Sequence, residues 1–272
     1  TRVRSSAASD VYKRQHGHYD DEQFDTDRER LLEEFQRQDI RYVMNIGANI
    51  VTSKASVELA HRYDFIYAAI GTHPDDAPEL SDAAIEMYRQ MAADEKVKAI
   101  GEIGLDYFHE DVPKEVQIHW FRKQLELAEE LKLPVVIHSR DAAKDTMDIM
   151  KEMQGRLCGG VIHCFSYSTE IAREYIKMGY YIGVGGVVTF NNGRKLKEVV
   201  EAIPLTSIVL ETDSPYLSPV PFRGKRNSAL NIPYVAKEIA ALKGVTEEEV
   251  YDVTFRNSLK LYRMEENMQA EA

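Results

Sequence analysis

Cysteines and long apolar runs are both scarce in this sequence, and each shortage narrows the class of protein. Cys158 and Cys164 are its two cysteines, too few for a disulfide framework and suited to a reducing compartment. No stretch of about 18 or more residues is apolar throughout, which argues against a membrane-spanning helix. The first residues also lack the apolar segment of a secretory signal peptide. We therefore expect a cytoplasmic protein without a membrane partner.

Positive charge is scarce as well. The 34 Lys and Arg residues face 45 Asp and Glu residues, which gives a formal net charge of -11. Such a chain does not adhere to nucleic acid through a broad basic face. It can still bind phosphates through metal ions, because bound cations supply local positive charge. The basic cluster at Arg223, Lys225 and Arg226 is either a phosphate contact or a solvated loop.

Residues 1–15 (TRVRSSAASDVYKRQ) differ from the acidic sequence that follows. They show neither apolar alternation nor a helical stripe, and we expect a leader of non-native appearance that is artefactual or disordered. A basic arm that contacts nucleic acid is the alternative. We place one barrel domain over residues 16–264 and a tail over residues 265–272, so the strand before His16 has a poor apolar sequence.

Short apolar runs alternate with stretches of helical period from residue 40 onward. Near-continuous Val, Ile and Leu runs predict strands buried on both faces, as in a parallel sheet covered by helices. Together with the segment before His16, the expected strands number eight; the others are Arg41–Ile46, Phe65–Ile70, Val97–Ile103, Pro134–Ile137, Gly160–Ile162, Tyr181–Val188 and Ser207–Leu210. The pattern predicts an α/β protein with a single-domain (β/α)8 TIM barrel. A doubly wound open sheet is the alternative.

Polar residues gather where these strands end. In a (β/α)8 barrel the carboxyl ends of the strands form one rim, which carries the catalytic groups. Five of the eight histidines occur at such ends. The polar residues at the strand ends are, in chain order, His16, His18, His73, Glu102, His138, His163 and Asp213.

The residue types at these ends indicate a metal site. His16 and His18 project to the same side of an extended segment, and neutral imidazoles bind divalent metals. A lone buried carboxylate such as Glu102 is unfavourable unless it is paired or coordinates metal, and it could bridge two cations. His138 and His163 end consecutive strands, which favours a shared ligand role over two separate core histidines. Asp213 could bind metal and act as general base, or it could simply form the turn before Pro215.

Other residues near the rim have less specific roles. We expect His73 and Arg140 to contact substrate phosphate, together with Arg223 and Arg226, although His73 could instead stabilise a turn. Alternation along the strand turns Cys164 away from the site, so we expect it to pack in the interior.

At this point the motifs resemble a known family. HGHYDD, GTHPDD, GEIGLDY, VIHSRDA, VIHCFS and ETDSPYL occur in this order, and together they resemble the TatD family of metal-dependent deoxyribonucleases from His16 to about Tyr262. The resemblance implies two divalent ions (Mg²⁺, Mn²⁺ or Zn²⁺). One ion would be held by His16, His18, Glu102 and Asp213, and the other by Glu102, His138 and His163. The chain departs from the usual family pattern at its first strand, at Tyr167 and at Ser228–Ala229.

The resemblance and the expected site together predict a hydrolase that cleaves phosphodiester bonds in DNA, with exonucleolytic action. Glu102 and Asp213 are the expected catalytic residues, and metal-activated water is the expected nucleophile. DNA is the expected partner, with a monomeric chain and no obligate protein partner. An amide or ester hydrolase with the same two-metal site, such as an aminoacyl-tRNA deacylase, is the first alternative. A non-catalytic binding or scaffold protein is the second.

Overall fold

The computed structural model describes residues 13–38 and 40–264, and for residues 13–16 it describes the backbone alone. The described residues form one sheet of eight parallel strands that follow the order of the chain. The strands are β1 (Lys13–Gly17), β2 (Ile40–Ile46), β3 (Ile66–Ile70), β4 (Val97–Asp106), β5 (Val135–Arg140), β6 (Gly160–Ile162), β7 (Tyr180–Val184) and β8 (Ile208–Leu210).

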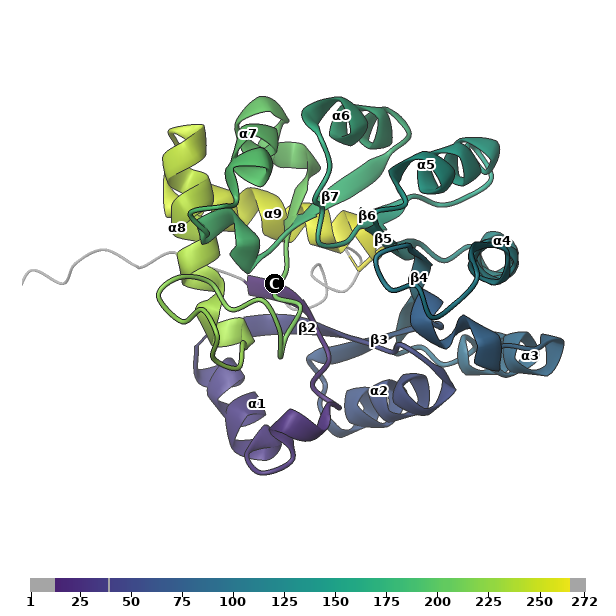
Figure 1. Ribbon diagram of the computed structural model, residues 1–272. Coiled ribbons are helices and arrows are strands. Elements are labelled where there is room, and N and C mark those ends of the chain that lie inside the picture. Colours follow the sequence, from purple (N-terminus) through teal and green to yellow (C-terminus); the bar gives the residue numbers. More distant parts are fainter. Residues whose placement is uncertain (1–12, 39, 265–272) are drawn as a thin grey trace, which may run out of the picture.

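The sheet closes on itself. Gly17 at the end of β1 forms a parallel bridge with Ser214, just beyond β8. The next amide, that of His18, donates to the Ser214 carbonyl at 2.8 Å. Figure 1 shows the strands at the centre with helices around them. The predicted (β/α)8 barrel is therefore confirmed, and the open sheet is not the arrangement found.

Helices follow the strands, as the stretches of helical period between the apolar runs predict. They are α1 (Arg28–Arg37), α2 (Ile50–Arg62), α3 (Asp82–Met91), α4 (Lys114–Leu131), α5 (Ala143–Glu152), α6 (Thr169–Lys177), α7 (Arg194–Ala202), α8 (Ile232–Lys243) and α9 (Glu247–Leu261). None of the helices in residues 13–264 combines the length and the apolar character needed to cross a bilayer.

Local chemistry fixes several helix ends. The Asn49 side chain accepts from the amides of Val51 and Thr52 at the start of α2, and the Thr52 side chain bonds back to Asn49. This capping box satisfies amides that have no partner within the helix. Gly244 ends α8 in the left-handed region, at φ 66°, which a residue without Cβ adopts most easily.

Several strand boundaries differ from the sequence predictions, and β4 and β5 each continue three residues further than expected, to Asp106 and Arg140. β1 begins at Lys13 and pairs with β2 from there, so a strand precedes His16, as the expected count of eight strands requires, although the barrel domain was predicted from residue 16. Strand pairing uses backbone amides and carbonyls, and a weakly apolar sequence can supply these. β7 ends at Val184, whereas the prediction continued to Val188; Gly186–Thr189 form a 3-10 turn instead. The expected tail over residues 265–272 lies outside the described residues.

An apolar plug fills the amino-terminal end of the barrel interior. Small and medium side chains from the strands, among them Ala69, Ala99 and Val136, form a buried cluster with Phe255 and Leu259 of α9. Figure 1 shows α9 lying across the barrel behind the strands. This end of the barrel is therefore packed, and the polar site must lie at the opposite end.

Candidate metal centre

Strand alternation brings the polar residues into the barrel interior. Val136 belongs to the buried interior cluster, and His138 lies two residues further along β5, on the same side. Val161 and His163 stand in the same relation at β6. The last inward-facing side chain of each of these apolar strands therefore lies at the rim of the barrel.

Glu102 reaches the centre because its neighbour has no side chain. A Cβ on Gly101 would lie 2.5 Å from the Cβ of Val136, so glycine permits the close approach of β4 and β5. The Glu102 amide donates to the Gly47 carbonyl at 2.9 Å. This bond fixes the backbone that carries the carboxylate.

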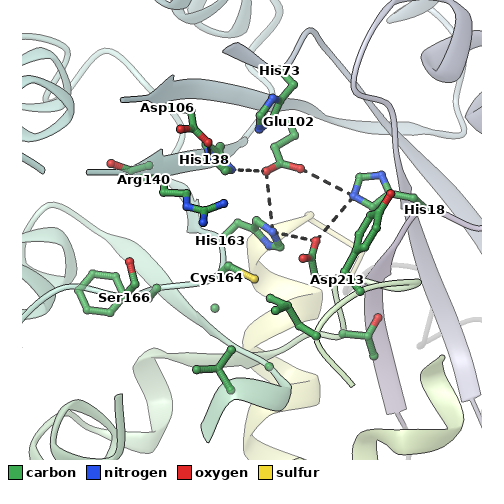
Figure 2. Close-up of a pocket in the computed structure, with 18 of the residues that line it drawn as sticks. His18, His73, Glu102, Asp106, His138, Arg140, His163, Cys164, Ser166 and Asp213 are labelled. Atoms are coloured by element: carbon green, nitrogen blue, oxygen red, sulfur yellow. Dashed lines mark hydrogen bonds and ion pairs between the residues drawn. The ribbon is translucent and has the colours of Figure 1, made fainter. Parts of the chain in front are cut away.

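The two oxygens of Glu102 face different imidazoles (Figure 2). Oε1 lies 2.9 Å from Nδ1 of His138 and 3.8 Å from Nε2 of His163, whereas Oε2 lies 3.8 Å from Nε2 of His18. Glu102 is 4 % exposed, and every ion pair it forms within residues 13–264 is with a histidine. One carboxylate therefore joins two groups of nitrogen ligands.

Asp213 lies opposite Glu102 and faces two of the same imidazoles. Its Oδ1 lies 3.2 Å from Nε2 of His163 and 3.8 Å from Nε2 of His18. The Asp213 backbone adopts φ 57°, and this left-handed turn lets a residue beyond β8 point back into the barrel. The carboxylate is thus shared between the same two groups of ligands.

A second layer of acceptors orients the imidazoles. His18 Nδ1 lies 2.7 Å from the Ile46 carbonyl, and His163 Nδ1 lies 2.9 Å from Glu211. His138 Nε2 lies 3.0 Å from Asp106. Each ring is held at one nitrogen while the other faces the central carboxylates, an arrangement found around metal-binding histidines.

In the absence of metal, protons balance the charges of the site. Burial lowers the pKa of His18, but the hydrogen bond with Asp213 and the charges of Glu102 and Asp213 outweigh it and raise the pKa to about 9. Burial also lowers the pKa of His138, but hydrogen bonds with Asp106 and Glu102 outweigh it and raise the pKa to about 9. Burial raises the pKa of Glu102, yet the nearby His163 and His138 lower it well below its usual value. Divalent ions would replace these protons.

The donor set fits divalent metals. Ligand atoms of His73, Glu102 and His138 lie within 4.8 Å of one another, and a second group of this kind includes His163 and Asp213. Mixed imidazole and carboxylate ligands suit Zn²⁺ and Mn²⁺. His73, Glu102, His138, His163, Cys164 and Asp213 belong to these groups, and His18 faces Glu102 and Asp213, so each of them could hold metal. The side chain of His16 lies outside the described residues, so its expected ligand role stays a prediction.

A cavity of about 1110 Å³ opens above the centre. Its volume is at the upper end of small-molecule sites. His73 and Arg140 line this cavity, and the phosphate contacts expected of them stay a prediction. His73 Nδ1 accepts from the Asp75 amide at 3.2 Å, so a hydrogen on Nε2 is available for donation. The Arg140 guanidinium lies over the Phe108 ring, 3.8 Å from its centroid.

The basic cluster near residue 225 does not reach the cavity. Arg223 and Arg226 are absent from the cavity lining among the described residues. The Arg226 guanidinium binds both carboxylate oxygens of Asp27, at 2.8 and 2.7 Å, and Arg223 lies over the Phe190 ring. The structure does not bring these arginines to the metal ligands, because partners elsewhere engage their guanidinium groups.

Three residues of the site were missed or misassigned in the sequence. Asp106 and Glu211 were given no role, although each is a buried acid near the end of a strand, two or more residues from a predicted ligand. Cys164 was expected to pack away from the site, yet it lines the cavity. Its sulfur lies within 4.8 Å of ligand atoms of His163 and Asp213. β6 ends at Ile162 and Cys164 adopts φ 43°, so strand alternation no longer applies there.

Comparison with known proteins identifies the family of this chain. The family described as TatD related DNase matches residues 15–263. An uncharacterized metal-dependent hydrolase of Bacillus subtilis, YabD, is 44% identical over 92% of this chain and 98% of its own. The 3'-5' ssDNA/RNA exonuclease TatD of Cronobacter sakazakii is 31% identical over 88% of this chain and 93% of its own.

Solved structures give the same result. The crystal structure of YjjV, a TatD homolog from Escherichia coli, superposes with a TM-score of 0.87 at 30% identity, covering 93% of this chain and 98% of its own. A hydrolase of the TatD family from Entamoeba histolytica superposes with a TM-score of 0.82 at 25% identity, covering 92% and 97%. The chain belongs to the TatD-related family of metal-dependent hydrolases.

Proposed function

We propose that this hydrolase cleaves phosphodiester bonds in DNA and acts from a strand end. The observation that carries the proposal is the double-sided Glu102 carboxylate, whose two oxygens face separate groups of imidazoles. Such a centre suits two divalent ions, which stabilise both the attacking and the leaving oxygen of a phosphoryl group. The Cronobacter relative named an exonuclease on single-stranded DNA and RNA supports this substrate class.

The distances around Glu102 and Asp213 support the division of ligands that the family resemblance implies. His18, Glu102 and Asp213 would hold one ion, and Glu102, His138 and His163 the other, with His16 as a further predicted ligand of the first. When bound, the ions would lower the pKa of water and neutralise charge on the phosphoryl oxygens. Their identity among Mg²⁺, Mn²⁺ and Zn²⁺ is part of the test below.

The chain's own groups supply proton transfer and positioning. Asp213 is ionised, because His163 and His18 lower its pKa despite its burial, and its Oδ1 can take the proton of an attacking water. His73 can donate from Nε2 to a phosphate oxygen, and Arg140 presents a cation at the cavity wall. Arg223 and Arg226 remain predicted phosphate contacts that would have to leave their present partners.

The direct test is cleavage of end-labelled single-stranded DNA with Mg²⁺, Mn²⁺ or Zn²⁺ and with a chelator. We expect ladder-like shortening from one end with metal and none with chelator. Aminoacyl esters should be tested in parallel, since the same centre could hydrolyse them. Chelator-insensitive cutting would overturn the metal mechanism, whereas ester hydrolysis without DNA cleavage would favour the alternative expected from the sequence.

A further inference from the structure

Opposite walls of the cavity differ in charge. The loops after β1 and β3 contribute Asp20, Asp21, Asp75 and Asp76 to its lining. Within the described part of the chain, none of the four forms an ion pair with Lys or Arg. The opposite wall contributes Arg140 at the end of β5 and Lys195 at the start of α7. Among residues 13–264, neither of these two side chains forms an ion pair with an acid.

An exposed aromatic ring lies on the acidic side. Tyr216 lines the cavity and is 53 % exposed, and the adjoining Leu217 is 38 % exposed. Large apolar side chains at this level of exposure, beside a polar catalytic centre, form a surface on which a flat ligand can stack.

The loop that carries Tyr216 is fixed to the catalytic Asp213. The Tyr216 amide donates to the Asp213 carbonyl at 2.7 Å, and the amide of buried Asn227 donates to the Pro215 carbonyl at 2.8 Å. The Tyr216 hydroxyl donates to Oδ2 of Asp21 at 3.4 Å. These bonds hold the ring between the loops after β8 and β1, at a set position relative to the centre.

We propose that this corner binds the terminal nucleoside of an unpaired strand. The terminal base stacks on the Tyr216 ring, and Asp21 repels any phosphate attached to the terminal hydroxyl. The remaining backbone, with its phosphates, runs from the centre towards Arg140 and Lys195. This assignment rests on the proposed function and adds which end of a strand the site accepts: one whose terminal hydroxyl is free.

Stacking is tested by binding in chelator, where no cleavage occurs. The 3' end is tested because the Cronobacter relative is named a 3'-5' exonuclease. An oligonucleotide with 2-aminopurine as its 3'-terminal base should lose fluorescence on binding the unaltered protein and Tyr216→Phe. Tyr216→Ala should abolish this quenching and weaken binding on the order of tenfold, because one base–aromatic stack contributes about 1–3 kcal/mol. Tyr234→Ala is the matched control, since Tyr234 is 38 % exposed and does not line the cavity.

End selection is tested by comparing cleavage of a 3'-hydroxyl oligonucleotide with its 3'-phosphate form in the presence of metal. The unaltered protein should cut the phosphate form roughly tenfold or more slowly, since a like charge beside it is unfavourable in a half-buried site. Asp21→Asn should narrow that ratio severalfold. Glu22→Gln removes a charge from the neighbouring exposed residue and should leave the ratio unchanged.

The outcomes separate this inference from the proposed function. Cleavage of neither oligonucleotide would refute the nuclease function, whereas the quenching test in chelator would still report on Tyr216. Cleavage of both forms at equal rates, or identical quenching by Tyr216→Ala and Tyr234→Ala, would overturn the inference and leave the nuclease function intact.

Discussion

The same strands build both ends of the barrel interior, but one end is an apolar cluster and the other is a polar site. At the amino-terminal end, Val136 and Val161 pack in a dry cluster with Phe255 of α9. Two residues further along the same strands, His138 and His163 face ionised carboxylates. The direction of the side chain is common to both ends, and the position along the strand decides whether it stabilises the fold or performs chemistry.

This comparison predicts that substitutions at the two ends separate activity from stability. The charged residues at the rim face one another within the site, so changing them should affect metal binding first. Residues of the plug are buried in an apolar cluster, so changing them should lower the free energy of unfolding first. The four experiments below test this separation.

The largest effect is expected for Glu102→Gln. The neutral amide cannot hold two cations, and we expect metal content to fall and hydrolytic activity to drop about a thousandfold or more. Thermal unfolding of the metal-free protein should change far less. Metal analysis by mass spectrometry and rate measurements check this, with exposed Glu86→Gln as the matched control. Near-normal activity of Glu102→Gln would contradict the assignment of the centre.

Phe255→Ala should give the converse result. Phe255 is 5 % exposed and stacks on Tyr42 with ring centroids 6.0 Å apart. Removing a buried phenyl group should lower the free energy of unfolding by about 3–5 kcal/mol. Denaturant titration measures this loss, and the folded protein should retain its metal. Phe108→Ala, at a ring that is 54 % exposed, should change the free energy of unfolding little. Loss of metal from folded Phe255→Ala would contradict the separation of the two ends.

A smaller effect is expected in the second layer. Glu211 holds Nδ1 of His163 and accepts from the Cys164 amide at 2.7 Å. Glu211→Gln should weaken metal binding by about 10- to 100-fold, because an orienting acceptor is replaced while the ligand remains. Titration with a competing chelator measures the affinity. Exposed Glu198→Gln should leave it unaltered, and an equal effect in both variants would argue against an orienting role.

The smallest effect is a dependence of stability on pH. The pKa values of His18 and His138 are raised from 6.5 to about 9 in the folded protein. Their contribution is therefore fully present below about pH 6.5 and is lost as the pH rises through about 9. Metal-free protein should therefore lose stability over this interval, seen as a fall in Tm.

Metal should reverse that trend, because ions compete with the same protons and bind more tightly as the pH rises. Thermal unfolding at several pH values, with saturating Mn²⁺ and with chelator, gives the comparison. An identical fall in Tm with and without metal would show that the imidazoles do not exchange protons for ions.

Residues at regular strand ends could be predicted, whereas residues beyond them could not. His138 lies within β5, and His163 directly follows β6, so the alternation of the strand indicates their direction. Cys164 follows one residue later, in a left-handed turn, and the same rule misassigned it. Asp106 and Glu211 were overlooked because their partners are imidazoles on other strands.

Contacts between distant segments were beyond the reach of the sequence. Asp27 and Arg226 are 199 residues apart and meet beside the barrel, so the guanidinium group of an expected phosphate contact forms an ion pair away from the cavity. Nothing in the sequence near Arg226 indicates Asp27 as its partner, because the contact exists only after the barrel closes.

The sequence by itself determined the alternation of strands and helices and the residue type at each strand end. Those are local properties, set by hydrophobic period and by the cost of burying an unpaired acid or imidazole. The tertiary structure alone decided which of these groups share one centre, which orient them from behind and how charge is divided between the cavity walls. Closure of the sheet sets those distances, since they join side chains from strands far apart in the chain.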